Sequence, residues 1–118
     1  VNIDANEFAP SHVLLRVRFV LSLVENDPQT AFALSELYAN HEQTAQEVHR
    51  RLKRDILVDH RRGLLRITNL EAEMAVLIIA SGVMEFLRVR HARKRGDIDY
   101  FLSFIRKICG YSSKGVSQ

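Results

Sequence analysis

The sequence contains an uninterrupted run of eleven apolar or small residues at 74–84, bounded by a glutamate on each side. A bilayer span needs about 20 such residues, so the run is too short to cross a membrane. It is typical instead of a helix that lies in the middle of a helical domain. We expect this central helix to begin after Thr68, because Thr68 and Glu71 have the spacing of a capping box, and to continue to Gly96.

Two helices are predicted before it at the N-terminal end of the domain. The first covers residues 12–24 and is apolar on almost every side. Pro28 ends that pattern and suits the first position of a new helix, while Asp27 can accept hydrogen bonds from the free N–H groups that follow it. A short second helix is therefore expected over about 28–40.

A third helix is predicted over 42–62, where apolar residues recur every three or four positions. Gly63 is placed to end it, since glycine adopts the left-handed backbone conformation at little cost. The last helix is expected to begin at Asp97 and to end at Gly110.

The predicted fold is all-α, a five-helix orthogonal or antiparallel bundle in one domain. The length of 118 residues fits one domain, and five Gly and two Pro leave little material for a loop-rich β fold. We expect a boundary or linker segment at 1–10, the helical domain at 11–110 and a disordered tail at 111–118. No signal peptide is apparent, and the single Cys109 suits a reducing compartment, so the expected location is the cytoplasm.

The central helix has three apolar faces, whereas the first and last helices can cover two of them. One interpretation is an ordinary single-chain bundle, in which Gly82 marks a close crossing within the chain. The preferred interpretation is a symmetric homodimer, in which the last two helices of each subunit form a four-helix bundle.

Motifs for chemistry are missing from the sequence. It contains no glycine-rich phosphate loop, no nucleophile elbow and no clustered Cys and His spacing, so we expect neither an enzyme nor a metal or cofactor site. Basic residues concentrate at 50–62 and 88–95. Most of them fall toward the C-terminal ends of helices, where the macrodipole stabilises cations, so solvated helix ends are preferred over nucleic-acid contacts.

A ligand pocket between the first four helices is a further hypothesis, since ligand sites in helical bundles are lined by apolar side chains with a few polar groups. Each candidate also fits a plain core position. The candidates are Phe19, Leu23, Tyr38, Leu52, Ile78, Ser81 and Met84.

The order of these elements resembles the C-terminal half of the TetR/AcrR family of transcriptional regulators. The residues that carry the resemblance are the NDP break at 26–28, the RRGLL end of the long helix at 61–65, the capped LEAEMAVLIIASGVMEFL segment at 70–87 and the closing DIDYFLSFIRKICGY at 97–111.

The resemblance implies an effector-binding and dimerisation domain whose last two helices build the dimer. It gives as interface candidates Ala75, Ile79, Gly82, Phe86, Phe101, Leu102 and Ile105. The family's N-terminal helix-turn-helix unit is missing from this sequence, so DNA contact is expected only through such a missing unit, and the chain is expected to be a fragment or a short protein.

The resulting hypothesis is the ligand-sensing, dimerising domain of a bacterial transcriptional regulator of this kind, a repressor or an activator, which forms a homodimer and binds a small apolar effector and no membrane. A stand-alone helical dimerisation or protein-interaction module is the alternative from another class. A basic module that binds nucleic acid through 88–95 is the third.

Overall fold

The computed structural model describes residues 11–89 and 96–111, and every structural statement below refers to these residues. They form helices and no strand apart from one isolated bridge between Leu65 and Tyr111, so the predicted all-α fold is confirmed. The helices are α2 (His12–Leu23), α3 (Pro28–Asn40), α4 (Glu42–Arg61), α5 (Asn69–Arg88) and α6 (Gly96–Cys109).

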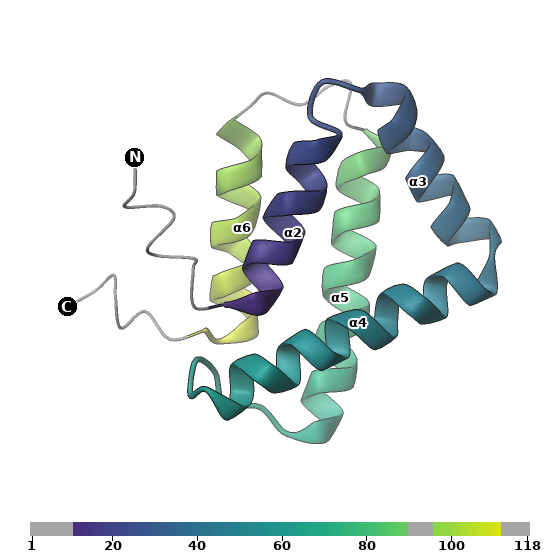
Figure 1. Ribbon diagram of the computed structural model, residues 1–118. Helices are drawn as coiled ribbons and strands as arrows, with labels where there is room; N and C mark the ends of the chain where they lie inside the picture. Colours follow the sequence, from purple (N-terminus) through teal and green to yellow (C-terminus); the bar gives the residue numbers. More distant parts are fainter. Residues whose placement is uncertain (1–10, 90–95, 112–118) are drawn as a thin grey trace.

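Helix α5 is the centre of the bundle and packs against α2, α3 and α4. Figure 1 shows α6, α2 and α5 running roughly alongside one another, with α3 at one edge. Helix α4 crosses the lower half of α5 at a steep angle in the same view. The arrangement is therefore an orthogonal bundle rather than a set of parallel helices.

The predicted helix ends are largely confirmed, because local capping residues set them. Asp27 accepts a hydrogen bond from the Thr30 N–H at 3.0 Å, and Pro28 follows as the first residue of α3. Thr68 and Glu71 form the expected capping box at the start of α5. Gly63 has a φ of 80°, the left-handed conformation expected after α4.

The end of the central helix was predicted wrongly. Helix α5 ends at Arg88 rather than near Gly96, because the backbone at Val89 leaves the helical region with a ψ of 24°. Gly96 is instead the first residue of α6. The remainder of the basic run, at 90–95, lies outside the described residues.

The ordered domain also continues past its predicted boundary at 110. Tyr111, which was assigned to a disordered tail, packs against the core and pairs with Leu65. The rest of that tail at 112–118 and the predicted N-terminal segment at 1–10 lie outside the described residues.

Two of the three apolar faces of α5 are buried within the chain. Burial of a Leu or Ile side chain contributes about 1.5 to 3 kcal/mol, so these contacts are the main source of stability. The buried side chains of α5 are Ala72, Ala75, Val76, Ile79, Ala80, Val83, Phe86 and Leu87. Those of α2 are Val13, Leu14, Val17 and Leu21.

Candidate interface on helices α5 and α6

Most of the predicted dimer-interface residues lie in the core of the single chain. Ala75, Ile79, Phe86, Leu102 and Ile105 are all buried there and leave almost no surface for a second subunit. Helical spacing placed the α5 members on one face correctly, but spacing does not tell whether that face meets the same chain or another.

The two remaining candidates, Gly82 and Phe101, are half-buried and meet each other. A Cβ atom added at Gly82 would lie 3.4 Å from Cζ of Phe101. The helix that approaches Gly82 is therefore α6 of the same chain. This is the intramolecular crossing that the first interpretation of Gly82 predicted.

Apolar surface nevertheless remains on α5 and α6, at positions that the sequence analysis did not select. Most of the exposed apolar side chains on each helix are spaced four residues apart. This spacing places them in a row on one face of the helix. Each of these side chains is about half exposed or more, and Tyr100 is 77% exposed. The exposed apolar residues of the two helices are Leu70, Met74, Leu77, Ile78, Tyr100, Phe104 and Ile108.

A groove lies between the two helices, and two of these exposed residues, Tyr100 and Phe104, line it. Phe86 and Phe101 meet there with their ring centroids 5.1 Å apart and their planes tilted by 37°. Tyr100 and Phe104 stand at its α6 side. The residues that line the groove are Gly82, Glu85, Phe86, Asp97, Tyr100, Phe101 and Phe104. The exposed Tyr100 ring thus lies at a groove that is lined largely by aromatic rings. The i, i+4 spacing of Tyr100, Phe104 and Ile108 was the signal that could have found this face.

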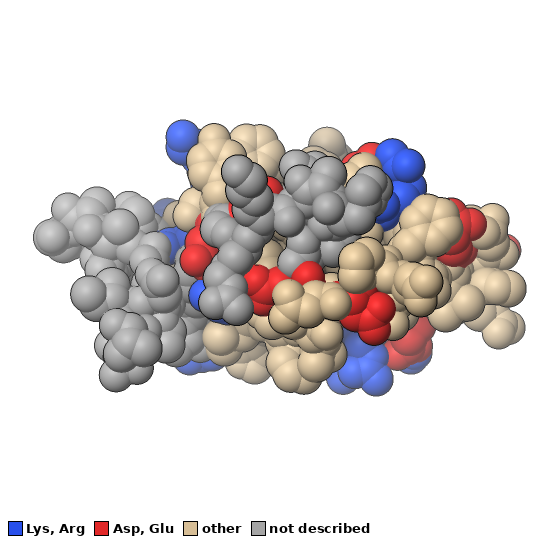
Figure 2. All heavy atoms as spheres, turned by 90° about the horizontal axis from the view of Figure 1, so that it is seen from above, with Lys and Arg blue, Asp and Glu red and all other residues tan. Residues whose placement is uncertain are grey.

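Helix α6 carries opposite charges at its two ends. Its first turn contains Asp97 and Asp99, and its last turn contains Arg106 and Lys107, which suits the helix macrodipole. Asp99 also pairs with Arg18 of α2. Figure 2 looks onto the end of the molecule where α2 ends and α6 begins, and shows acidic side chains across it with Lys and Arg at its margins.

The structure places the predicted pocket residues in different surroundings. Phe19 and Leu23 are 63% and 65% exposed, and Phe19 lines an open depression along α2 that contains none of the other six. Ile78 is 53% exposed on α5, whereas Leu52 is buried in the core. Met84 is half-buried against the core.

Two members of the predicted pocket, Tyr38 and Ser81, do come together in a polar cluster with His49. The Tyr38 hydroxyl lies 2.5 Å from Nε2 of His49, and the two rings meet edge to face. Burial raises the pKa of the Tyr38 phenol, and a hydrogen bond with Ser81 acts in the opposite direction. The cluster joins α3, α4 and α5, and sequence reasoning missed His49.

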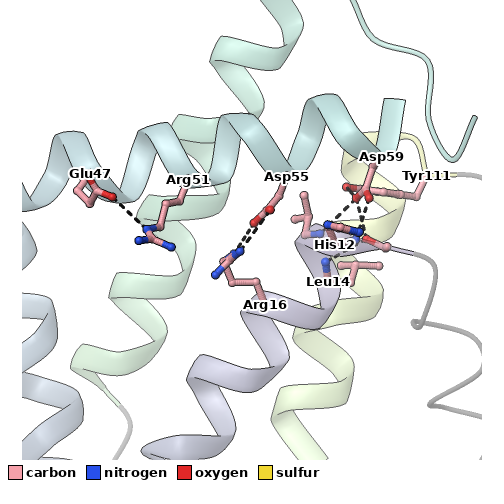
Figure 3. A network of polar contacts seen from close by, with 10 residues as sticks. His12, Leu14, Arg16, Glu47, Arg51, Asp55, Asp59 and Tyr111 are labelled. Atoms are coloured by element: carbon pink, nitrogen blue, oxygen red, sulfur yellow. Dashed lines mark hydrogen bonds and ion pairs between the residues drawn. The ribbon is translucent and has the colours of Figure 1, made fainter. Parts of the chain in front are cut away.

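A second polar network fastens α4 to both ends of the described chain (Figure 3). Asp59 is completely buried and accepts hydrogen bonds from the Ser11 hydroxyl at 2.9 Å and from the backbone N–H groups of His12 and Val13 at 2.8 and 3.2 Å. The Tyr111 hydroxyl donates to the same carboxylate at 2.7 Å. The carboxylate therefore caps the N-terminus of α2 from a different helix.

The surroundings of Tyr111 keep it a hydrogen-bond donor. Burial and the adjacent Asp59 carboxylate both raise the pKa of the Tyr111 phenol. One turn earlier on α4, the buried Asp55 pairs with the Arg16 guanidinium (Figure 3). Asp59 follows the buried Leu52 and Ile56 at helical spacing on one face of α4, and an acidic residue in such an apolar stripe is a signal for a buried polar contact.

Within residues 11–89 and 96–111, no three His, Cys, Asp or Glu side chains gather as a metal ion would require. No helix in the same part of the chain combines the length and the apolar character that crossing a membrane demands. No protein-family model, curated protein or solved structure matches this chain.

Proposed function

We propose that this chain is the homodimerising regulatory domain of a one-component transcriptional regulator similar to the TetR/AcrR family, with its dimer built on the groove face of α5 and α6. The observation that supports the dimer most is the exposed Tyr100 ring beside the groove that it lines. A twofold rotation places the same surface of two subunits in contact, so each subunit can offer a ring to the hollow of the other.

The pattern along α6 suits an antiparallel pairing with a second copy of itself. Positions 97, 100, 104 and 107 share one face of the helix and are symmetric about residue 102. In such a pairing Tyr100 lies opposite Phe104 of the other subunit. Asp97 then faces Lys107 of the other subunit, so that opposite charges meet twice.

The strength of this contact is expected to be modest. Burying the exposed half of an apolar side chain contributes about 1 kcal/mol, so a dozen such side chains across a dimer contribute on the order of 12 kcal/mol. Association costs about 4 to 15 kcal/mol. The gain from burial and the cost of association are similar in size. A single charged substitution in the groove should therefore dissociate the dimer.

The substitution Phe104→Glu tests this directly. It places a charge beside the groove at a position that is half exposed in the single chain, so the fold is expected to survive. Light scattering after gel filtration should give the mass of two chains for the natural protein and of one chain for the variant. Phe19→Glu, an exposed aromatic position on α2, is the matched control and should remain dimeric. Equal dissociation by both variants would contradict the assignment of the face.

A charge exchange tests the antiparallel geometry. Asp97→Lys or Lys107→Asp alone should weaken the dimer, because each places like charges opposite each other. The two changes together should restore much of the affinity, which sedimentation equilibrium would measure. If the double variant is weaker than either single one, the two helices do not pair in this way.

The sensing half of the proposal rests on the resemblance and on the Tyr38, His49 and Ser81 cluster. A small apolar molecule that binds there must favour one arrangement of the dimer by about 1 to 3 kcal/mol to act as an effector. A thermal-shift screen of hydrophobic compounds tests it, with Tyr38→Phe as the variant that should reduce any stabilisation. If no compound in the screen raises the melting temperature, the result would favour the stand-alone dimerisation module.

A further inference from the structure

The outer face of α4 forms a shallow basic depression that the dimer does not use. Its residues lie between positions 50 and 61 of the helix, a length of about 16 Å, and the rotation of 100° per residue places them on the side of α4 opposite Asp59. They are Arg50, Lys53, Arg54, Leu57 and Arg61. We call these five residues the arginine face, and none of them lines the groove between α5 and α6.

The arginine face holds positive charge that the described carboxylates neutralise only in part. Arg50 pairs with Glu47, and Lys53 pairs with Glu73. Arg54 and Arg61, in contrast, are exposed and have no carboxylate partner in the part of the chain that the structure describes.

The same excess of charge continues beyond the end of the helix. Arg62 and Arg66 are also exposed, and neither has an ion-pair partner within the described ranges. Arg16, Arg18, Arg51 and Arg88 of the same chain are each paired with a carboxylate. Among the described residues, the guanidiniums without a carboxylate partner therefore lie in α4 and the turn that follows it.

The composition of the arginine face indicates what kind of anion fits it. Along α4, all of which the structure describes, no large apolar side chain is highly exposed. A helix that lies on a membrane needs such side chains to enter the lipid, so a membrane surface is a poor fit. The face also lacks aromatic rings on which unpaired bases could stack. What remains is a row of guanidinium donors, which suit phosphate oxygens.

We propose that the arginine face of α4 binds the phosphate backbone of double-stranded nucleic acid without reading its sequence. Contacts of this kind position a protein on a duplex and carry no base preference. The proposed site lies apart from the dimer face, so the nucleic-acid proposal can be tested independently of the dimer.

Fluorescence anisotropy with a labelled DNA duplex of about 20 base pairs tests the proposal across a range of salt concentrations. Four phosphate contacts give a slope of log affinity against log salt of about −3.6. The double variant Arg54→Ala, Arg61→Ala should lower the magnitude of that slope by about 2 and weaken binding more than tenfold at low salt. A change of the sequence of the duplex should have little effect.

Arg51→Ala is the control for either single change, Arg54→Ala or Arg61→Ala, because it removes one positive charge from the same helix. Arg51 pairs with Glu47 and lies on the side of α4 that carries Asp55 (Figure 3), so its loss should change the slope by much less than either of those single changes does. Circular dichroism would verify that each variant keeps its helical content.

Three results would overturn the proposal. The first is no binding to the duplex at low salt, and the second is a slope that Arg54→Ala, Arg61→Ala leaves unchanged, which would move any contact to another basic segment such as 88–95. The third is binding to acidic phospholipid vesicles or to polyglutamate that equals or exceeds binding to the duplex, which would assign the arginine face to a different partner.

Discussion

Replacing Asp59 with alanine removes an acceptor that four donors share in the interior of the protein. Hydrogen bonds to charged groups contribute about 1.5 to 3 kcal/mol each, but bonds to one group are not additive, and water can reach the exposed His12 side. Ser11 and Val13 lose their partner while buried, which adds a desolvation cost. We expect a loss of about 3 to 5 kcal/mol in the free energy of unfolding.

A loss of that size is large beside a total stability of about 5 to 15 kcal/mol. Urea denaturation of the natural protein and of Asp59→Ala would measure it, and the melting temperature should fall by roughly 12 to 20 °C. Tyr111→Phe removes a single donor to the same carboxylate and should cost about 1 to 2 kcal/mol.

Asp99→Ala is the control for a simple loss of negative charge. Its ion pair with Arg18 is largely exposed, and such pairs contribute about 1 kcal/mol or less. The reasoning is refuted if Asp59→Ala costs no more than Asp99→Ala, because the buried carboxylate would then contribute nothing beyond an exposed one.

Three smaller predictions follow from single contacts. Burial raises the pKa of the Cys109 thiol to about 11. A thiol reagent should therefore react far more slowly with the folded than with the unfolded chain at pH 8. Its reaction with the folded chain should become faster as the pH approaches 11. Gly82→Ala should leave the free energy of unfolding equal or raise it by up to about 1 kcal/mol, because the new methyl group would meet Phe101 at an ordinary contact distance. A clear loss of stability in chemical denaturation would show that the two helices cross more tightly. Thr68→Ala should cost about 1 kcal/mol through loss of the capping box with Glu71, whereas no change in the unfolding midpoint would mean that the box contributes nothing.

The helix ends could be predicted because each depends on residues within one turn. Asp27, Thr68 and Gly63 act through their own side chains or backbone conformations, and the structure places each as expected. The end of α5 was missed because the sequence after Arg88 contains neither glycine nor proline before Gly96 to mark a stop.

The faces of α5 could not be assigned from the sequence in the same way. Periodicity grouped Ala75, Ile79 and Phe86 correctly, but which group meets the same chain depends on how α2, α3 and α4 pack around it. The exposed group that remains, including Met74 and Ile78, became visible only when those neighbours were in place. The candidate interface is therefore a property of the packing rather than of any one helix.

Long-range polar contacts escaped prediction for the same reason. Asp59 lies 46 to 52 positions from the groups that it binds, and no local pattern links residues so far apart in the chain. Its place in an apolar stripe was the available signal, and it points to burial without naming the partners.

The mass of the natural protein in solution decides whether two chains associate through α5 and α6. Sedimentation equilibrium at tens of micromolar should give a species of twice the chain mass of 13.6 kDa, in a monomer–dimer equilibrium that shifts toward the single chain on dilution. A mass of 13.6 kDa at every concentration up to that range would contradict a dimer built on α5 and α6.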